Sequence, residues 1–437
     1  METIVVYSPN ISPRLTYVLD WLIKERLQLS YTLIDTKPTN SNSNALIISY
    51  GATSNGAISI PDVGLLWETG VADQKPAAGI WQELPTLFST NDDSMTLNFD
   101  MLSAIFYLLS RYEEYYTYTP DKHNRYPPTE SILYRKGLLS RPIVDEWVDA
   151  FRRMLNTTTG KNIPQHLFTY LPTYDIDIAY SHLHKGVRRI FGAYLRAILR
   201  MDMVQIAERT RVLKKKLKDP YDSFRWLRQL HKLHNYRPIY FILCADKTSA
   251  FDKNIHPLNP AMIRVIKNVA KDGEIGIHPS YYSYQESITR SEINTLQNIT
   301  NQTIKISRQH YIKIKMPETY KLLIANNIEV DYSMGYGSKL GFRAGTGSSF
   351  LWYNIQNETT TNLRIYPFCF MDTTAHYELR LTPQEAIERL TNMTRLLRKT
   401  GSQLTTVYHN FSVGMSTEWT GWRQAYEAFL EENKPTA

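Results

Sequence analysis

The chain has 437 residues, which is more than one ordinary compact core accommodates, so two or three domains are expected. Its net charge of +8 comes from 50 basic and 42 acidic residues. That excess is mild for this length and leans toward anionic partners without establishing one. Two cysteines, Cys244 and Cys369, exclude a disulfide-rich scaffold and cannot form a structural zinc site alone.

The N-terminal residues METIVVYSPNISPRL have no basic region, only a short apolar run and no small-residue cleavage site, which predicts that no signal peptide is present. No apolar stretch reaches the roughly 18 residues that a membrane-spanning helix requires. We therefore expect a cytoplasmic protein without a transmembrane segment.

The first 160 residues read as a small α/β domain with a helical connector. Its apolar, β-branched runs predict strands at residues 3–7, 29–34 and 45–50. Apolar residues at helical spacing predict helices at 13–27, 99–116 and 142–155. The run NTTTGKN at 156–162 is the best candidate for a linker between residues 1–160 and 161–437.

Beyond the linker, strand and helix patterns alternate. The seven candidate strands span residues 166–174, 237–243, 274–277, 303–307, 328–331, 363–370 and 403–408. Helical patterns lie between several of them, for example at 259–271, 317–325 and 382–399. This alternation predicts an α/β fold in which residues 161–437 form a distorted (β/α)7-type barrel.

In such barrels the reactive side chains lie at the C-terminal ends of the strands. The first predicted strand ends in T-Y-D-I-D, which supplies Asp175 and Asp177. Two carboxylates at this spacing suit a site in which one holds a metal and the other acts as a base. The simpler interpretation is a pair of capping or solvated aspartates, and the D-x-D pattern also occurs in glycosyltransferase-like and phosphatase-like sites.

Three further strand ends carry candidate residues. His278 follows the third strand and is a plausible ligand for zinc or a similar ion. Arg308 and His310 follow the fourth, where an arginine beside a carboxylate would fix its direction. His409 ends the last strand. Each histidine alone is as well explained by a structural hydrogen bond.

Taken in order, these strand ends resemble the polysaccharide deacetylase family, also called NodB-homology or carbohydrate esterase family 4. The resemblance covers residues 168–430. Its five motifs correspond to T-Y-D-I-D at 173–177, H-P-S-Y-Y at 278–282, R-Q-H-Y at 308–311, D-Y-S-M-G at 331–335 and V-Y-H at 407–409. Blocks such as FDMLSAIFYLLSRYEEY and WTGWRQAY resemble a subgroup, common in Bacteroidetes, with an uncharacterised N-terminal domain.

The resemblance implies a role for each motif residue. Asp175 would be the base held by Arg308, and His409 would protonate the departing amine. The fourth motif supplies Asp331, which would orient either His409 or Arg308.

The metal, with zinc implied, would rest on Asp177 and His278. The family's second metal histidine falls on Tyr282, so His310, Ser280 or water would complete the coordination.

Two segments outside the motifs carry charge. Arg343 lies in the glycine-rich run DYSMGYGSKLGFRAGT, where it either anchors an acidic sugar or phosphate or braces the loop against a carboxylate. Residues 185–218 are strongly basic with interleaved apolar residues. The simplest interpretation is an amphipathic helix with a solvated basic side, and peripheral membrane contact is the alternative. The basic run is local and has no recognition motif, so no nucleic-acid partner is expected.

The sequence thus predicts a metal-dependent hydrolase that removes an N-acetyl group from an amino sugar of a poly- or oligosaccharide. A second hypothesis is a catalytically degenerate, carbohydrate-binding barrel, which the missing second histidine favours. A third, a D-x-D glycosyltransferase or phosphatase, leaves the histidines at the strand ends unexplained.

Overall fold

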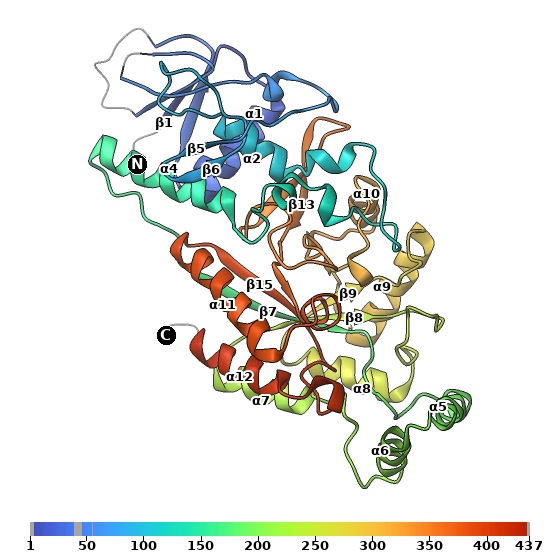
Figure 1. Cartoon of the computed structure of the whole chain (residues 1–437). Coiled ribbons are helices and arrows are strands. Elements are labelled where there is room, and N and C mark those ends of the chain that lie inside the picture. Colours follow the sequence, from blue (N-terminus) through green and yellow to red (C-terminus); the bar gives the residue numbers. More distant parts are fainter. Residues whose placement is uncertain (1–3, 39–45, 55, 435–437) are drawn as a thin grey trace.

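The computed structural model describes residues 4–38, 46–54 and 56–434. Two main sheets organise the molecule, a small one near the N-terminus and a large curled one formed by the rest of the chain (Figure 1). Among the described residues, no helix combines the length and apolar character needed to cross a membrane.

The small sheet has the strand order β2-β1-β3-β4, and its strands are parallel. They are β1 (Ile4–Tyr7), β2 (Tyr31–Ile34), β3 (Ile47–Tyr50) and β4 (Ile58–Ile60), with a separate hairpin of β5 (Gly79–Trp81) and β6 (Leu84–Thr86). The predicted helix at 13–27 is α1 (Pro13–Leu19), which continues into a π-helical segment, Asp20–Arg26. The second predicted helix begins as α2 (Met101–Leu109), with Asp100 as its N-cap.

The third predicted helix, α4 (Ile143–Thr159), continues four residues into the segment expected to be a linker. Threonine hydroxyls donate back to carbonyls one turn earlier, from Thr157 to Arg153 and from Thr159 to Leu155. The helix ends at Gly160, whose φ of 65° is accessible to glycine at little cost. The extended connection therefore starts at Gly160.

The large sheet has nine strands in the order β12-β13-β11-β10-β9-β8-β7-β15-β14, and all of them except β12 run parallel to their neighbours. The strands are β7 (Thr169–Ile176), β8 (Ile239–Leu243), β9 (Glu274–His278), β10 (Ile306–Ser307), β11 (Val330–Asp331), β12 (Phe350–Asn354), β13 (Thr359–Ile365), β14 (Phe370–Met371) and β15 (Gln403–His409). The central strands are almost fully buried, as expected of parallel strands covered on both faces. The prediction of a distorted barrel is confirmed.

The predicted strand at 363–370 is in fact two strands. β13 pairs with β11 at one end of the sheet, while β14 pairs with β15 at the other. Only residues 366–369 join them, a span of roughly 17 Å at most when extended. The sheet must therefore curl until its two ends nearly meet, although the described residues form no pairing that closes it.

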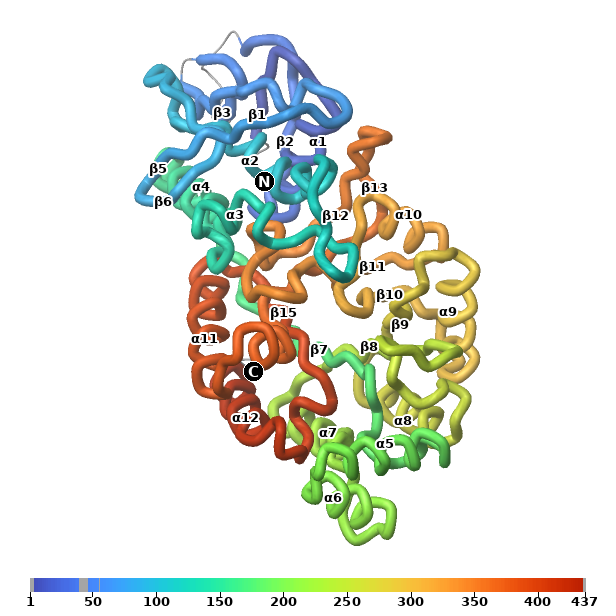
Figure 2. The backbone as a smooth tube through the Cα atoms, turned by 45° about the vertical axis from the view of Figure 1, so that its right-hand side comes forward, coloured from blue at the N-terminus to red at the C-terminus, as the bar shows by residue number. Residues whose placement is uncertain are grey.

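Helices cover the outside of the curled sheet (Figures 1 and 2). They include α7 (Phe224–Leu233), α8 (Pro260–Val269), α9 (Glu286–Thr300), α10 (Glu318–Ala325), α11 (Pro383–Lys399) and α12 (Trp422–Glu432). Two further helices, α5 (Val187–Leu199) and α6 (Met203–Leu213), stand away from this layer as a hairpin at one end of the molecule.

The N-terminal part packs directly on one end of the large sheet. Trp21 donates through its indole nitrogen to the Ser349 carbonyl, and the Tyr17 hydroxyl donates to the carbonyl of Leu351 in β12. A buried cluster, which we call the joint network, consists of Arg111, Glu113, Glu114 and Arg343. Arg343 donates to both carboxylate oxygens of Glu114, at 2.8 and 2.6 Å, so it braces the glycine-rich loop and does not face a ligand.

Candidate metal and catalytic site

The register of the parallel strands brings the predicted site residues to one edge of the large sheet. His409, at the end of β15, lies opposite Asp175 of β7. His278 is the last residue of β9, two strands away, and Arg308 directly follows β10. Because these strands are parallel, their C-terminal ends meet, and residues more than 200 positions apart in the sequence share a pocket.

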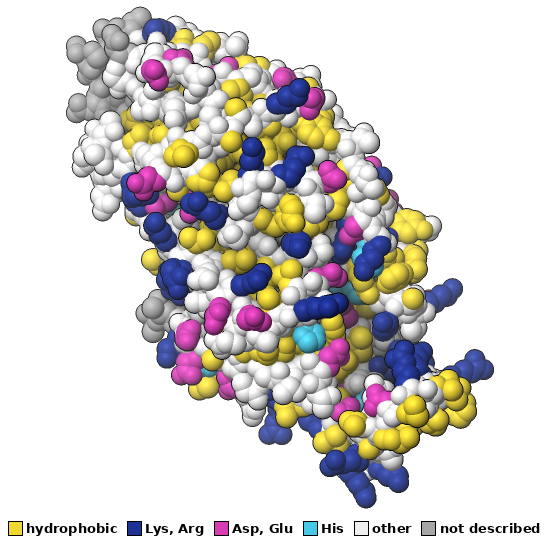
Figure 3. Space-filling model, in the orientation of Figure 1, with side chains coloured by type: hydrophobic (Ala, Val, Ile, Leu, Met, Phe, Trp, Pro, Cys, Tyr) yellow, Lys and Arg dark blue, Asp and Glu magenta, His cyan; other side chains and the backbone are white. Residues whose placement is uncertain are grey.

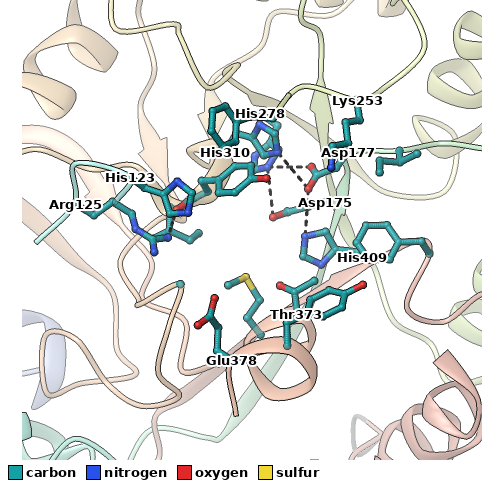
Figure 4. Close-up of a pocket in the computed structure, with 18 residues that line it drawn as sticks. His123, Arg125, Asp175, Asp177, Lys253, His278, His310, Thr373, Glu378 and His409 are labelled. Atoms are coloured by element: carbon teal, nitrogen blue, oxygen red, sulfur yellow. Dashed lines mark hydrogen bonds and ion pairs between the residues drawn. The ribbon is translucent and has the colours of Figure 1, made fainter. Parts of the chain in front are cut away.

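Three side chains form a cluster with the composition of a metal site: Asp177, His278 and His310. Their ligand atoms lie within 4.8 Å of one another. The Nε2 atoms of His278 and His310 are 3.2 and 3.4 Å from the two carboxylate oxygens of Asp177. Figure 4 shows both rings turned toward that carboxylate.

The other ring nitrogen of each histidine is held by a protein acceptor. His278 Nδ1 lies 2.5 Å from the Arg308 carbonyl oxygen, and His310 Nδ1 lies 3.0 Å from an oxygen of Asp252. A histidine that donates through Nδ1 presents Nε2 as the ligand atom, which is the usual arrangement around a metal. The orientation of both rings is therefore fixed for coordination.

One carboxylate oxygen of the cluster accepts no hydrogen bond from any described residue. This oxygen, Oδ1 of Asp177, is buried. Burial raises the pKa of Asp177, but His310 and His278 outweigh this effect and hold it well below its ordinary value. Burial lowers the pKa of His310, but Asp177 and Asp252 raise it to about 9. One carboxylate and two imidazoles are a donor set that zinc accepts, once His310 gives up its proton.

Asp175 lies beside this cluster, and the Arg308 guanidinium fixes the orientation of its carboxylate. Arg308, which is fully buried, donates from Nη1 to Asp175 Oδ1 at 2.8 Å and to the hydroxyl of Thr173 at 2.7 Å. The other oxygen, Oδ2, is directed to the cluster and lies 3.7 Å from His278 Nε2. Arg308 does not itself line the pocket but fixes the direction of a carboxylate that does.

His409 also approaches the cluster, with its Nε2 3.4 Å from Asp177 Oδ2. Its Nδ1 is 2.7 Å from Asp372, which also accepts from the His409 backbone N–H. Burial lowers the pKa of His409, but Asp372 and Asp177 outweigh this effect and hold it well above its ordinary value. These two carboxylates therefore favour the protonated form of the His409 ring.

Asp372 was not among the residues that the sequence singled out. It directly follows β14, so a carboxylate immediately after an apolar strand, the same signal that selected Asp175, would have identified it. The predicted strand at 363–370 obscured that position, because its break into β13 and β14 was not expected.

Asp331 was expected to orient His409 or Arg308, and the geometry does not support this. Its carboxylate is fully buried and accepts from the hydroxyls of Ser307 and Ser333, each at 2.8 Å. It does not line the pocket. The carboxylate beside His409 is that of Asp372.

The segment after β10 places His310 by an unusual backbone. Tyr311 and Ile312 have φ values of 58° and 54°, a region that non-glycine residues, and β-branched ones above all, rarely adopt. Such conformations cost about 1–3 kcal/mol each and are concentrated at functional sites. Tyr282, by contrast, is 46% exposed and does not line the pocket, so His310 and not position 282 supplies the second imidazole.

The pocket has a volume of about 350 Å³ and is lined by Asp175, Asp177, His278, His310 and His409 (Figure 4). Aromatic side chains of Phe251, Tyr311, Tyr377 and Phe411 form much of the remaining wall. The N-terminal part contributes as well, because His123 and Arg125 reach the same pocket. Arg125 donates to the Tyr311 carbonyl at 2.5 Å and so secures the strained segment.

Comparisons with known proteins agree on little beyond the general architecture. A family profile described as a family of unknown function, DUF7033, matches residues 4–160, and no curated protein matches the chain. A solved structure from Mycobacterium smegmatis, assigned as a polysaccharide deacetylase, is 16% identical with a TM-score of 0.40, covering 61% of this chain and 84% of that one.

Two other solved structures are less similar. A polysaccharide deacetylase from Bacillus cereus is 10% identical with a TM-score of 0.30, covering 60% of this chain and 87% of that one. A pseudoenzyme of the CE4 family from Bacillus anthracis is 9% identical with a TM-score of 0.31, covering 61% and 62%. Similarities of this strength do not establish an activity for this chain.

Proposed function

We propose that this protein is a metal-dependent hydrolase that removes an N-acetyl group from an amino sugar of a poly- or oligosaccharide. The observation that carries the proposal is that a carboxylate and an imidazole, each held by a partner of opposite charge, lie beside the Asp177 cluster in one pocket. Arg308 holds Asp175 through Oδ1 and leaves Oδ2 directed to the cluster. Asp372 holds His409 through Nδ1 and leaves Nε2 3.4 Å from Asp177. Amide hydrolysis needs such a pair of base and acid near one electrophile.

The proposed metal ligands are Asp177, His278 and His310, and zinc is the ion that this donor set suits best. A divalent ion bound there would polarise the acyl carbonyl and acidify a water molecule. The remaining positions around the ion are left to water and substrate, as in other catalytic sites with three protein ligands.

The protein's own residues perform the proton transfers. Asp175 Oδ2 accepts a proton from the attacking water, while Arg308 holds the carboxylate through Oδ1. As the C–N bond breaks, His409 donates its Nε2 proton to the leaving amine, and Asp372 stabilises the imidazolium before the transfer. The products are acetate and the free amino sugar.

The aromatic walls of the pocket support a carbohydrate substrate. Tyr311, Tyr377 and Phe411 offer flat apolar faces that suit the C–H faces of sugar rings, while Arg125 and Thr373 offer polar contacts. The position of His310 supports an active enzyme over a degenerate, purely sugar-binding barrel, because His310 offers an imidazole to the cluster in place of the one missing at Tyr282.

The test is acetate release from N-acetylglucosamine oligosaccharides by the purified protein, before and after chelation and zinc restoration. We expect turnover that depends on zinc and that falls at least about a hundredfold in Asp175→Asn, the loss typical of a missing general base. The variant should retain its metal. Zinc-loaded protein that binds the sugar without releasing acetate would establish the non-catalytic alternative instead.

A further inference from the structure

A second cleft, of about 490 Å³, lies beside the candidate site between α5, α6 and the loop at 248–253. Five cationic side chains line it: Lys185, Arg189, Arg196, Arg209 and Lys253. Its described lining includes no aspartate or glutamate. Ile178 and Lys253 line both this cleft and the catalytic pocket, so the two are contiguous.

The positive charge of this cleft is poorly compensated. The Arg209 side chain is buried, with 7% of the residue exposed, and its Nη1 has no partner among the described residues. The ammonium groups of Lys185 and Lys253 also form no ion pair with any residue that the structure describes. Burial, and then the charge of Arg189, lower the pKa of Lys185 to about 8. Cationic side chains that line one cleft repel one another. An anion bound between them offsets this repulsion, so such a cleft favours anion binding.

The cleft is also connected to the metal cluster through the chain. The loop that forms one wall carries Asp252, whose Oδ1 holds His310 while its Oδ2 accepts from the hydroxyl of Ser249. Ser249 itself lines the cleft. A group bound there is therefore next to the residues that position the His310 imidazole, the proposed metal ligand.

We propose that this cleft binds a phosphate or diphosphate group of the substrate, so that the deacetylated sugar is a glycosyl phosphate or diphosphate and not a neutral glycan. Arginine side chains bind phosphate oxygens through two parallel N–H groups, and the lysines add point charges. The proposal rests on the proposed hydrolase function for the sugar, but anion binding can be measured without turnover.

The experiment is calorimetric titration of the full-length protein with inorganic pyrophosphate. We expect saturable binding that weakens at least about tenfold in Lys185→Gln/Arg196→Gln, because two cationic contacts to the anion are lost. Lys216→Gln, an exposed cation of the same segment outside the cleft, should bind as the wild type does. Asp177→Asn, which lacks a metal ligand, should also bind normally, which excludes binding to the ion.

Substrates then distinguish the source of the phosphate. An N-acetylated sugar diphosphate linked to a short prenol and one linked to a nucleoside should both be better substrates than the neutral oligosaccharide, and the better of the two identifies the natural carrier. Pyrophosphate that does not bind, or binds equally well to Lys185→Gln/Arg196→Gln, overturns the proposal. Failure of acetate release from every substrate, with pyrophosphate still bound, would overturn the hydrolase function and leave the anion site standing.

A separate observation concerns the outer surface of the hairpin formed by α5 and α6. Large apolar side chains are exposed along one face of α5 at helical spacing and continue through the turn: Val187, Phe191, Leu195, Ile198, Leu199, Met201, Met203 and Val204. Phe191 is 70% exposed and Leu199 is 76% exposed. Figure 3 shows these apolar side chains gathered at one corner of the molecule and flanked by cationic ones.

The charge around this apolar face indicates its partner. Residues 185–218 contain eleven basic and two acidic residues, a net charge of +9 against +8 for the whole chain, so the remainder is almost neutral. Basic side chains beside exposed apolar ones on an amphipathic helix are typical of contact with an anionic membrane surface. We infer that the hairpin docks on an anionic bilayer, with its apolar face in the headgroup region.

Sedimentation with vesicles tests this inference. The protein should bind vesicles of phosphatidylcholine with about 30% phosphatidylglycerol, less at high salt, and hardly at all to phosphatidylcholine alone. Phe191→Ser/Leu199→Ser should weaken binding at least about tenfold, since two large apolar side chains no longer enter the headgroup region. Leu233→Ser, an exposed leucine on α7, is the matched control. Absence of vesicle binding, or a wild-type dimer that Phe191→Ser/Leu199→Ser converts to a monomer, would overturn it.

Discussion

The joint network and the candidate site both bury charged side chains, but they differ in how completely those side chains are hydrogen-bonded within the protein. In the joint network, the guanidinium groups of Arg111 and Arg343 donate to Glu113, to Glu114 and to backbone carbonyls, so their charges are matched within the protein. In the site, Asp177 Oδ1 and Arg308 Nη2 have no hydrogen-bond partner among the described residues. Buried charges that stabilise a fold are paired with other groups of the protein. Buried charges of a binding site, in contrast, keep polar atoms available for a ligand or a metal ion.

Two buried glutamates show the same contrast. Burial raises the pKa of Glu114, but Arg343 and Arg111 outweigh this effect and lower it below its ordinary value. Glu292, behind the pocket, accepts a hydrogen bond from the Ser280 backbone N–H and faces no arginine in the described structure, and burial raises its pKa to about 7. The arginines of the joint network therefore favour the charged form of Glu114, whereas burial favours the neutral form of Glu292.

The largest expected effect comes from breaking the joint network. Arg343→Met leaves Glu114 with one of its two buried cations, and we expect the free energy of unfolding to fall by about 3–5 kcal/mol in urea titrations. Arg364→Met, which removes a partly exposed pair with Glu25, should cost at most about 1 kcal/mol. Equal losses in the two variants would show that the joint network carries no special stability.

The next effect concerns His409, the proposed general acid, and its partner Asp372. Asp372→Asn should lower turnover by about 10²–10⁴-fold, because the imidazolium of His409 loses its counter-charge. The alkaline limb of the kcat profile should move to lower pH, since His409 then loses its proton more readily. Asp331→Asn, which removes a buried aspartate outside the pocket, should leave that limb unchanged, and a shift in this variant would return the role to Asp331.

A smaller effect is expected at the contact that orients His310. Asp252→Asn should weaken zinc affinity about 10–100-fold, the loss usual when a residue that holds a metal-binding histidine is changed. Competition with a fluorescent zinc chelator measures it. Asp246→Asn, an exposed carboxylate near the same loop, is the control. Unchanged affinity in Asp252→Asn would mean that Asp252 has only a structural role.

A further expected effect is a pH dependence of stability. The pKa of Glu292 is about 7 in the folded chain and about 4.3 when unfolded, so in this window the folded state binds the proton more tightly. Its contribution is present below about pH 4.3 and is lost as the pH rises to about 7. Glu292→Gln should therefore flatten the pH dependence of the unfolding free energy between about pH 4.3 and pH 7. An identical slope in the variant would assign the dependence to other groups.

The sequence predicted those parts of the fold and site that depend on local pattern. Apolar runs that end in Asp175, Asp177, His278 or His409 identify strand ends, and parallel register then brings them together. Asp372 was missed because its position depends on the sheet dividing one apolar run between its two ends. Asp252 lies in a loop without a regular pattern, and only the folded chain brings it to His310.

The alternatives for Arg343 could be resolved only by three-dimensional contacts. Its partner, Glu114, is 229 residues away, and nothing in either local sequence indicates the other. The same holds for His123 and Arg125, which the N-terminal part adds to the pocket.

The central claim is that Asp177, His278 and His310 hold one divalent metal ion. Elemental analysis of the protein after dialysis against zinc tests it directly. At a zinc concentration about tenfold above the wild-type Kd, we predict close to one zinc per wild-type chain and per Tyr282→Phe chain. Asp177→Asn and His310→Ala should each hold about a tenth of that or less, because loss of a ligand weakens affinity by about a hundredfold or more. Wild-type protein without zinc, or full retention of zinc by His310→Ala, would contradict the account.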